Sequence, residues 1–91
     1  MQFEAYGQEN IHEQDQWGQR TVEFAHFTHT SGKKVDLFNT HLCVCSEGDL
    51  LKSARTLADV IQRHRRPGSK VVLTGDFNVF GGLVTEWYKC F

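Results

Sequence analysis

The sequence has 91 residues, of which 40% are hydrophobic and 23% are charged, and its formal net charge is −1. This composition is typical of one small globular domain and excludes a chain of two domains. A net charge this close to zero also excludes the strong basic field that indicates nonspecific binding to nucleic acid.

The N-terminal part of the chain gives no sign of regular structure. Residues 1–16 show no sustained hydrophobic period and are rich in Gln and Glu. This predicts an irregular N-terminal segment over 1–16, followed by a domain over 17–91. The segment has no apolar run of the kind found in signal peptides or membrane spans. If Met1 is the true start, we expect a cytoplasmic or nuclear protein without a membrane span.

A β-hairpin is predicted next. From Arg20 to about Thr28, apolar and polar residues alternate, which is the pattern of a half-buried strand. Residues 29–33 supply turn chemistry, and residues 34–42 are rich in β-favouring side chains. The two strands should therefore pair antiparallel, and we expect Asp36 in the second of them to be solvated.

A helix should follow the hairpin. The stretch from Ser46 to Asp49 resembles a capping box, and apolar residues recur at helical spacing from Leu50 to Ile61. Basic residues at 63–66 suit a helix C-terminus, and the Pro-Gly pair after them stops the helix. A solvated helix end is the simpler interpretation of the basic residues, and a contact with phosphate or nucleic acid is the alternative.

A third strand completes the predicted order. The unbroken apolar run at residues 71–74 is typical of a strand buried on both faces. A strand, a crossover helix and a further strand should give a parallel pair with a right-handed connection. The sequence therefore predicts an α/β (α+β) fold built from a β-hairpin, a crossover helix and a parallel β-strand.

The three cysteines are Cys43, Cys45 and Cys90. An odd number in a scattered arrangement argues against a disulfide framework, so we expect mostly free thiols. The spacing of Cys43 and Cys45 makes them weak candidates for zinc ligands, because no second pair of ligands matches it.

Polar side chains stand where the second and third strands end. His41 closes the second strand, and Asp76 and Asn78 follow the third. Because the carboxyl ends of parallel strands meet at one edge of a sheet, these three side chains should converge. A carboxylate can deprotonate water or hold a hard cation, an amide can donate to a phosphoryl oxygen, and a histidine can donate to a phosphate.

The residues around these strand ends carry a family resemblance. Residues 38–42, the helix after them and residues 72–78 resemble the NTHL and TGDFN signature of the deoxyribonuclease-I-like endonuclease/exonuclease/phosphatase superfamily. Trp17 and Arg20 resemble the Trp and Arg that precede this hairpin in some members. The resemblance implies that residues 17–91 are a partial endonuclease/exonuclease/phosphatase domain, a fragment of a four-layer α/β sandwich.

The resemblance also implies a function. It indicates a metal-dependent phosphoester hydrolase, that is, a Mg²⁺-dependent phosphodiesterase, nuclease or phosphatase that cleaves a phosphodiester or phosphomonoester with activated water. His41 would contact the scissile phosphate, Asp76 would activate water and bind Mg²⁺ or Mn²⁺, and Asn78 would stabilise the pentacovalent phosphorus. Asn39 and Arg20 are the expected substrate-binding residues.

The match to the family is incomplete. The family's metal-binding Glu and second catalytic His are not recognisable, since Glu4, Glu9 and Glu13 lie in the segment predicted to be irregular. Many relatives carry Asp where this chain has Cys43. A non-catalytic remnant or interaction module of the same fold is therefore the alternative, and an incomplete product that exposes the inner face of its sheet is a third reading. Nucleic acid and small phosphorylated molecules both stay open as substrates, and so does the oligomeric state.

Overall fold

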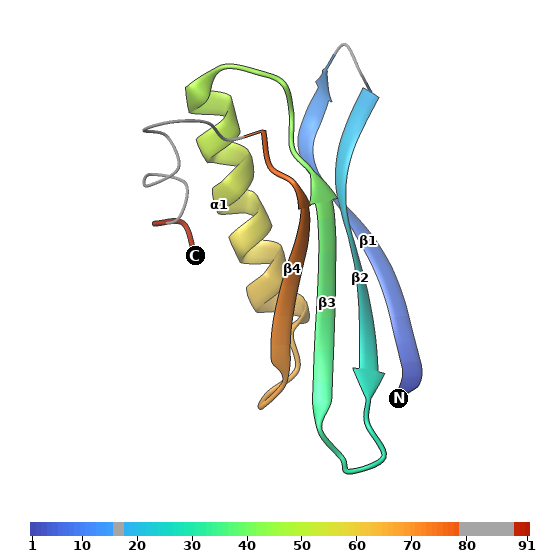
Figure 1. Ribbon diagram of the computed structural model, residues 1–91. Coiled ribbons are helices and arrows are strands. Elements are labelled where there is room, and N and C mark those ends of the chain that lie inside the picture. The colour runs from blue at the N-terminus through green and yellow to red at the C-terminus, as the bar shows by residue number, and fades with distance from the viewer. Residues whose placement is uncertain (16–17, 79–88) are drawn as a thin grey trace.

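The computed structural model describes residues 1–15, 18–78 and 89–91, without the side chains of residues 12–15. Its elements in chain order are β1 (Gln2–Asp15), β2 (Gly18–Thr28), β3 (Lys34–His41), α1 (Glu47–His64) and β4 (Lys70–Asp76). The strands form one sheet in the order β1-β2-β3-β4, and α1 lies against one face of it (Figure 1). β1, β2 and β3 are antiparallel neighbours, and β4 is parallel to β3. The predicted hairpin, crossover helix and parallel strand are confirmed.

β1 corrects the prediction of an irregular segment over residues 1–16. The strand pairs antiparallel with β2 along its length, but the register shifts between Phe3 and Ala5, between Asn10 and His12, and again before Asp15. Each such irregularity changes which side chains face the core. The alternation of apolar and polar residues that reveals a strand in a sequence is therefore missing from β1, and the prediction was wrong there.

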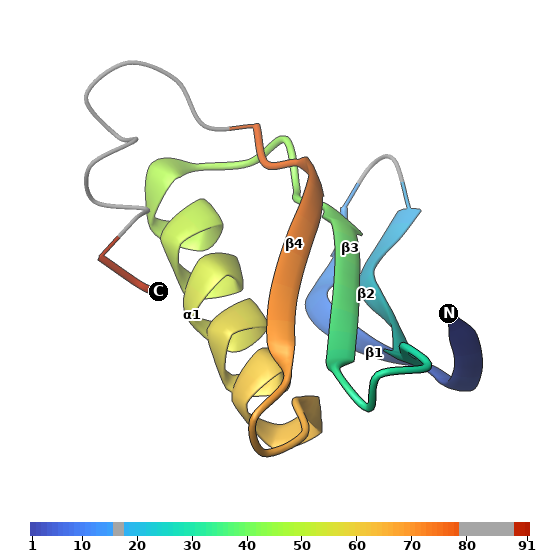
Figure 2. The same cartoon turned by 60° about the horizontal axis from the view of Figure 1, so that its bottom comes forward.

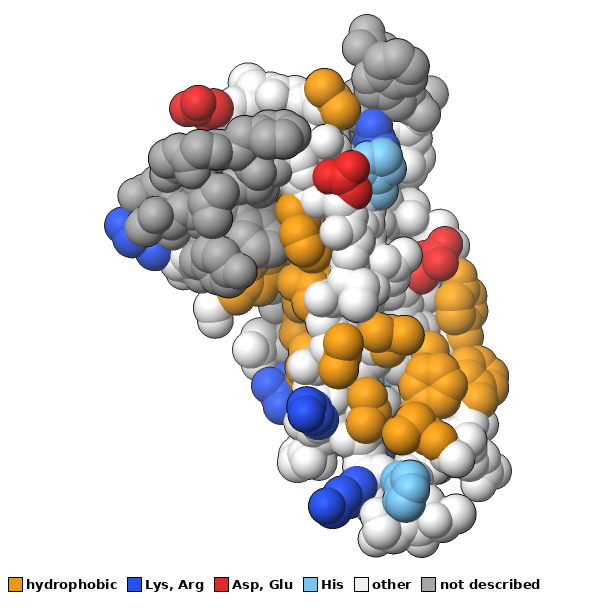
Figure 3. Space-filling view, in the orientation of Figure 1, with side chains coloured by type: hydrophobic (Ala, Val, Ile, Leu, Met, Phe, Trp, Pro, Cys, Tyr) orange, Lys and Arg blue, Asp and Glu red, His pale blue; other side chains and the backbone are white. Residues whose placement is uncertain are grey.

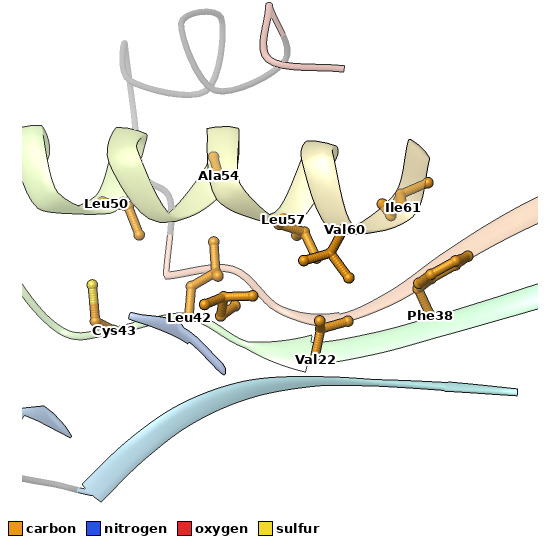
Figure 4. Close-up of a cluster of buried hydrophobic side chains, with 10 residues drawn as sticks. Val22, Phe38, Leu42, Cys43, Leu50, Ala54, Leu57, Val60 and Ile61 are labelled. Carbon is orange, nitrogen blue, oxygen red and sulfur yellow. The ribbon is translucent and has the colours of Figure 1, made fainter. Parts of the chain in front are cut away.

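The hydrophobic core lies between α1 and the sheet, as Figure 4 shows. The predicted cap is confirmed, because the Ser46 side chain accepts a hydrogen bond from the backbone N–H of Asp49. No helix in the described part of the chain is long and apolar enough to cross a membrane. The buried hydrophobic residues are Ile11, Val22, Phe38, Leu42, Cys43, Leu50, Ala54, Leu57, Val60 and Ile61.

The other face of the sheet is not covered by any element among the described residues (Figure 2). Hydrophobic side chains gather on this face over the strands (Figure 3). Strand alternation puts Leu37 and Val72 there, both half-buried, and Phe3 stands 55% exposed beside Phe27. β4 is therefore half-buried along its apolar run, and the prediction that it is buried on both faces was wrong.

A buried ion pair fastens the end of α1 to the sheet. Asp36 is 0% exposed, so the prediction that it is solvated was wrong. The backbone N–H and the guanidinium of Arg66 donate to its carboxylate, and Ser69 Oγ donates at 2.6 Å. Burial raises the pKa of Asp36, but the hydrogen bonds from Ser69 and Arg66 outweigh it and hold the pKa below its ordinary value. A charge is tolerated here because it is paired and fully hydrogen-bonded.

Candidate active site

His41 and Asp76 lie together at the carboxyl end of the parallel pair. They are direct partners in the β3–β4 register, and His41 Nε2 is 3.6 Å from Asp76 Oδ2. Both side chains are mostly exposed, at 59% and 67%. Figure 3 shows acidic and histidine side chains side by side at the upper end of the uncovered sheet face. The structure thus brings together two of the three residues that the sequence expected to converge.

Asn78 lies beside them, but its side chain has a structural partner. Its backbone N–H donates to Asp76 Oδ1 at 3.0 Å, and its Nδ2 donates to the carbonyl of Leu42 at 2.6 Å. The Leu42 N–H in turn donates to the carbonyl of Asp76 at 2.9 Å. Asn78 therefore ties the end of β4 to the end of β3. An amide nitrogen carries two N–H groups, so the bond to Leu42 uses half of its donor capacity.

A small pocket of about 160 Å³ opens beside His41. Both residues predicted to bind substrate, Arg20 and Asn39, line it, and Arg20 is 9% exposed. Trp17, which shares the family resemblance with Arg20, lies outside the described residues. The pocket is lined by Gln19, Arg20, Thr21, Glu23, Asn39, Thr40 and His41.

Two residues at this edge were not singled out from the sequence. Glu23 is exposed, lines the pocket and is the register partner of Asn39 on β2. Thr74 is the partner of Asn39 on β4, and its hydroxyl donates to Asn39 Oδ1 at 2.9 Å. The signal was present in the sequence, because Thr74 stands two residues before Asp76 and side chains two apart in a strand share a face.

The carboxylates of β1 lie elsewhere. Glu4 accepts a hydrogen bond from Arg66 at 2.9 Å, and Glu9 accepts bonds from Arg63 and His64. The hydrogen bond from His64 is the main cause that lowers the pKa of Glu9. The side chain of Glu13 is outside the described residues. Glu4 and Glu9 thus fasten β1 to the end of α1, and neither is paired at the His41 edge.

The described residues fit only part of a magnesium site. No group of three or more His, Cys, Asp or Glu side chains capable of holding a metal occurs among them. Mg²⁺ is usually held by one or two carboxylates and keeps several waters or phosphate oxygens. Asp76, which is exposed and at the strand end, has the chemistry of one such ligand.

Comparisons with known proteins bear on this arrangement. No family model matches the sequence, and no curated protein matches it. Among solved structures, an endonuclease/exonuclease/phosphatase family protein from Bacteroides thetaiotaomicron matches 98% of this chain with a TM-score of 0.77 and 21% identity. A mannosyl-6-phosphatase from the same organism matches 99% of the chain with a TM-score of 0.77 and 22% identity. An endonuclease/exonuclease/phosphatase from Bacteroides vulgatus matches 98% with a TM-score of 0.74 and 24% identity.

The match covers nearly all of this chain but a minor part of each neighbour. The chain spans 35% of the length of the first structure and 37% of each of the other two. The fold implied by the NTHL and TGDFN stretches is therefore confirmed, and its partial extent with it. This chain has the fold of part of an endonuclease/exonuclease/phosphatase domain.

Proposed function

We propose that the chain belongs to the endonuclease/exonuclease/phosphatase superfamily and supplies part of a site that hydrolyses a phosphoester with activated water. The observation that carries this proposal is the His41–Asp76 pair, aligned across β3 and β4 with 3.6 Å between Nε2 and Oδ2. A base and a proton donor at this separation can act on two atoms of one small substrate group. Both are exposed, so a substrate can reach them.

Each residue has a distinct role in the proposal. Asp76 accepts a proton from the attacking water, and His41 donates to a phosphate oxygen. Arg20 and Asn39, which both line the pocket, bind the phosphoryl group through the guanidinium and the amide. Asn78 keeps the two strand ends in register through Leu42 and offers its remaining N–H to a phosphoryl oxygen, which stabilises the charge around the pentacovalent phosphorus.

The proposed cofactor is Mg²⁺ or Mn²⁺. Such an ion polarises a phosphoryl oxygen and stabilises the charge that develops on it. Asp76 is the described residue that would hold it, together with water and the substrate phosphate.

A small phosphorylated molecule suits the site better than nucleic acid. The pocket beside His41 is small, at about 160 Å³, which suits a compact ligand more than a polymer. The net charge of −1 does not attract a polyanion. One structural neighbour is a mannosyl-6-phosphatase, which makes a sugar phosphomonoester the first substrate to test.

The test compares a phosphomonoester, such as mannose 6-phosphate, with bis-p-nitrophenyl phosphate and plasmid DNA, each with Mg²⁺, with Mn²⁺ and with a chelator. We expect metal-dependent release of phosphate that is lost in Asp76→Ala and His41→Ala. His29→Ala is the matched control, because His29 is exposed in the β2–β3 turn, and its imidazole bonds to Ser31 within that turn, away from the His41 edge. Turnover that survives Asp76→Ala would rule out the proposed site.

A second candidate is a non-catalytic interaction module of the same fold. The observation that favours it is the absence, within residues 1–11, 18–78 and 89–91, of a cluster of three metal-binding side chains. This reading expects a chain that is folded by circular dichroism and shows no turnover with any metal. The same assay separates the two candidates.

A further inference from the structure

The loop between β3 and α1 carries a disulfide that the proposed function does not use. Cys43 and Cys45 are bonded across a single intervening residue. This corrects the expectation of mostly free thiols, although Cys90 keeps its thiol. Cys43 is 1% exposed and points toward the first turns of α1 (Figure 4), whereas Cys45 is exposed.

A disulfide in this position contributes little to holding the fold together. The stabilisation from closing a loop falls as the loop shortens, and a loop of three residues is among the shortest possible. Cys43 packs in the core as a small apolar residue, and its Sγ lies 3.9 Å from Ser53 Oγ. The core contact of Cys43 therefore does not depend on the bond to Cys45.

The same disulfide is open to attack. Exposed disulfides are reduced more readily than buried ones and are the ones that serve as labile or regulatory bonds. Cys45 and Val44 are both exposed, so a thiolate can approach Cys45 from solvent. One half of the disulfide is thus anchored in the core, and the other half is reachable.

The loop is joined directly to the candidate active site. Leu42, the residue before Cys43, donates its N–H to the Asp76 carbonyl and accepts the Asn78 amide on its own carbonyl. On the other side of the disulfide, Ser46 caps α1. A change in the backbone path from 43 to 45 therefore occurs between two residues that are held in place, Leu42 and Ser46. Of these, Leu42 is hydrogen-bonded to two residues of the site.

We propose that Cys43–Cys45 is a reversible thiol–disulfide exchange site whose state is transmitted through Leu42 to Asp76 and Asn78. The reductant is a dithiol, either a small molecule or a protein. Its thiolate attacks Cys45 Sγ, the bond between the two cysteines breaks, and Cys43 leaves as a thiolate that takes up a proton. The second thiol of the reductant then attacks its own mixed-disulfide sulfur and releases Cys45. Two electrons and two protons pass to the cysteine pair, and the dithiol becomes a disulfide.

The first experiment measures the state of each cysteine. The full 91-residue chain is equilibrated in buffers that run from oxidised to reduced glutathione, quenched with acid and alkylated, and peptide mapping reports Cys43, Cys45 and Cys90 separately. We expect Cys43 and Cys45 to become alkylated together, with a midpoint inside the glutathione series, and to be protected again on reoxidation. Cys90 serves as the internal reference. Two outcomes would overturn the proposal: a pair that stays alkylated in excess oxidised glutathione, or one that stays protected in excess reduced glutathione.

The second experiment measures the coupling. Backbone amide signals of Leu42 and Asn78 are recorded by NMR in the oxidised and the reduced chain, and we expect both to shift. Cys45→Ser is the matched control, chosen because Cys45 is exposed and its replacement leaves the core intact. In that variant the amide chemical shifts of Leu42 and Asn78 should equal those of the reduced chain and should not change with the redox buffer. Identical chemical shifts in the oxidised and reduced states of the natural sequence would show that the disulfide is not coupled to the site. Neither experiment measures turnover, so its result is independent of whether the proposed hydrolase activity is found.

Discussion

His41 and Asp76 are direct partners across the parallel β3–β4 pair, with 3.6 Å between the imidazole Nε2 and the carboxylate Oδ2. They belong to segments that α1 separates in the chain, so the strand register alone brings them together. Whatever shifts β4 along β3 therefore separates the two groups.

Gly75→Ala should disrupt the register at the site. Gly75 has φ of 141° and pairs with Thr40, and a Cβ at Gly75 would overlap the Thr40 carbonyl. The strain and the clash should together lower the free energy of unfolding by about 3 kcal/mol, measured by urea denaturation. Gly48→Ala is the control, because that position has open space in the first turn of α1 and should change stability by less than about 1 kcal/mol. Equal effects of the two changes would contradict this account.

Asn78→Ala should destabilise the chain more than Asn78→Gly. Asn78→Gly removes the hydrogen bond to Leu42 and should cost about 1 kcal/mol of unfolding free energy. Asn78→Ala loses the same bond and also places a β-carbon at φ of 50°, which should add about 1 to 2 kcal/mol. Thermal unfolding of the two variants side by side gives the order. A Gly variant less stable than the Ala variant would show that the backbone does not need this conformation.

Arg66→Ala should destabilise the chain far more than Arg63→Ala. Arg66 is 17% exposed and pairs with the fully buried Asp36, so its removal takes the guanidinium away from a buried carboxylate at a cost of about 3 to 5 kcal/mol. Arg63 is 58% exposed and pairs with Glu9, and a solvent-exposed pair of this kind contributes little to stability. Urea denaturation measures both. Similar losses in the two variants would mean that the Asp36 pair does not hold the helix end.

Stability should fall in acid. The pKa of Asp36 lies below its ordinary value of 3.8, and that of Glu9 lies below 4.5. A carboxyl whose pKa is lowered by folding stabilises the folded chain fully above its ordinary pKa, and that contribution is lost as the pH falls toward the lowered value. Urea denaturation from about pH 7 to about pH 3 should therefore show a steady loss at the acid end. In Asp36→Asn the free energy of unfolding should depend less on pH in this range. An unchanged pH dependence would mean that other groups cause the loss of stability in acid.

The uncovered sheet face should bind a hydrophobic dye. Leu37 and Val72 lie half-buried on that face, which also carries the exposed Phe3. Exposed apolar surface of this kind binds dyes such as anilinonaphthalene sulfonate and promotes association. The double change of Leu37→Thr and Val72→Thr should reduce the dye fluorescence, whereas Val44→Thr, in the β3–α1 loop and 58% exposed, should leave it unchanged. Unchanged dye fluorescence in the double variant would show that the dye binds at another surface.

Local patterns were sufficient to predict much of the fold. The alternation in β2 and β3, the Ser46 cap and the helical spacing of α1 are each written within a few neighbouring residues, so each could be read without the rest of the chain. The parallel pairing expected across a crossover helix then put His41 and Asp76 at one edge. Those parts of the fold and of the candidate site were predicted for a physical reason that holds in any small sheet.

The sequence by itself thus determined the hairpin, the helix, the parallel strand and the residue types at the strand ends. Tertiary structure alone decided that β1 joins the sheet, because its bulges erase the alternation, and that Asp36 is buried, because its partners Arg66 and Ser69 come from far along the chain. It also decided that Asn78 fastens Leu42 and that the cysteines of the β3–α1 loop are bonded. Each of these features depends on a contact between segments distant in sequence or on the exact path of a loop. Long-range contacts and loop paths produce no periodic pattern of apolar and polar residues, so the sequence alone does not reveal them.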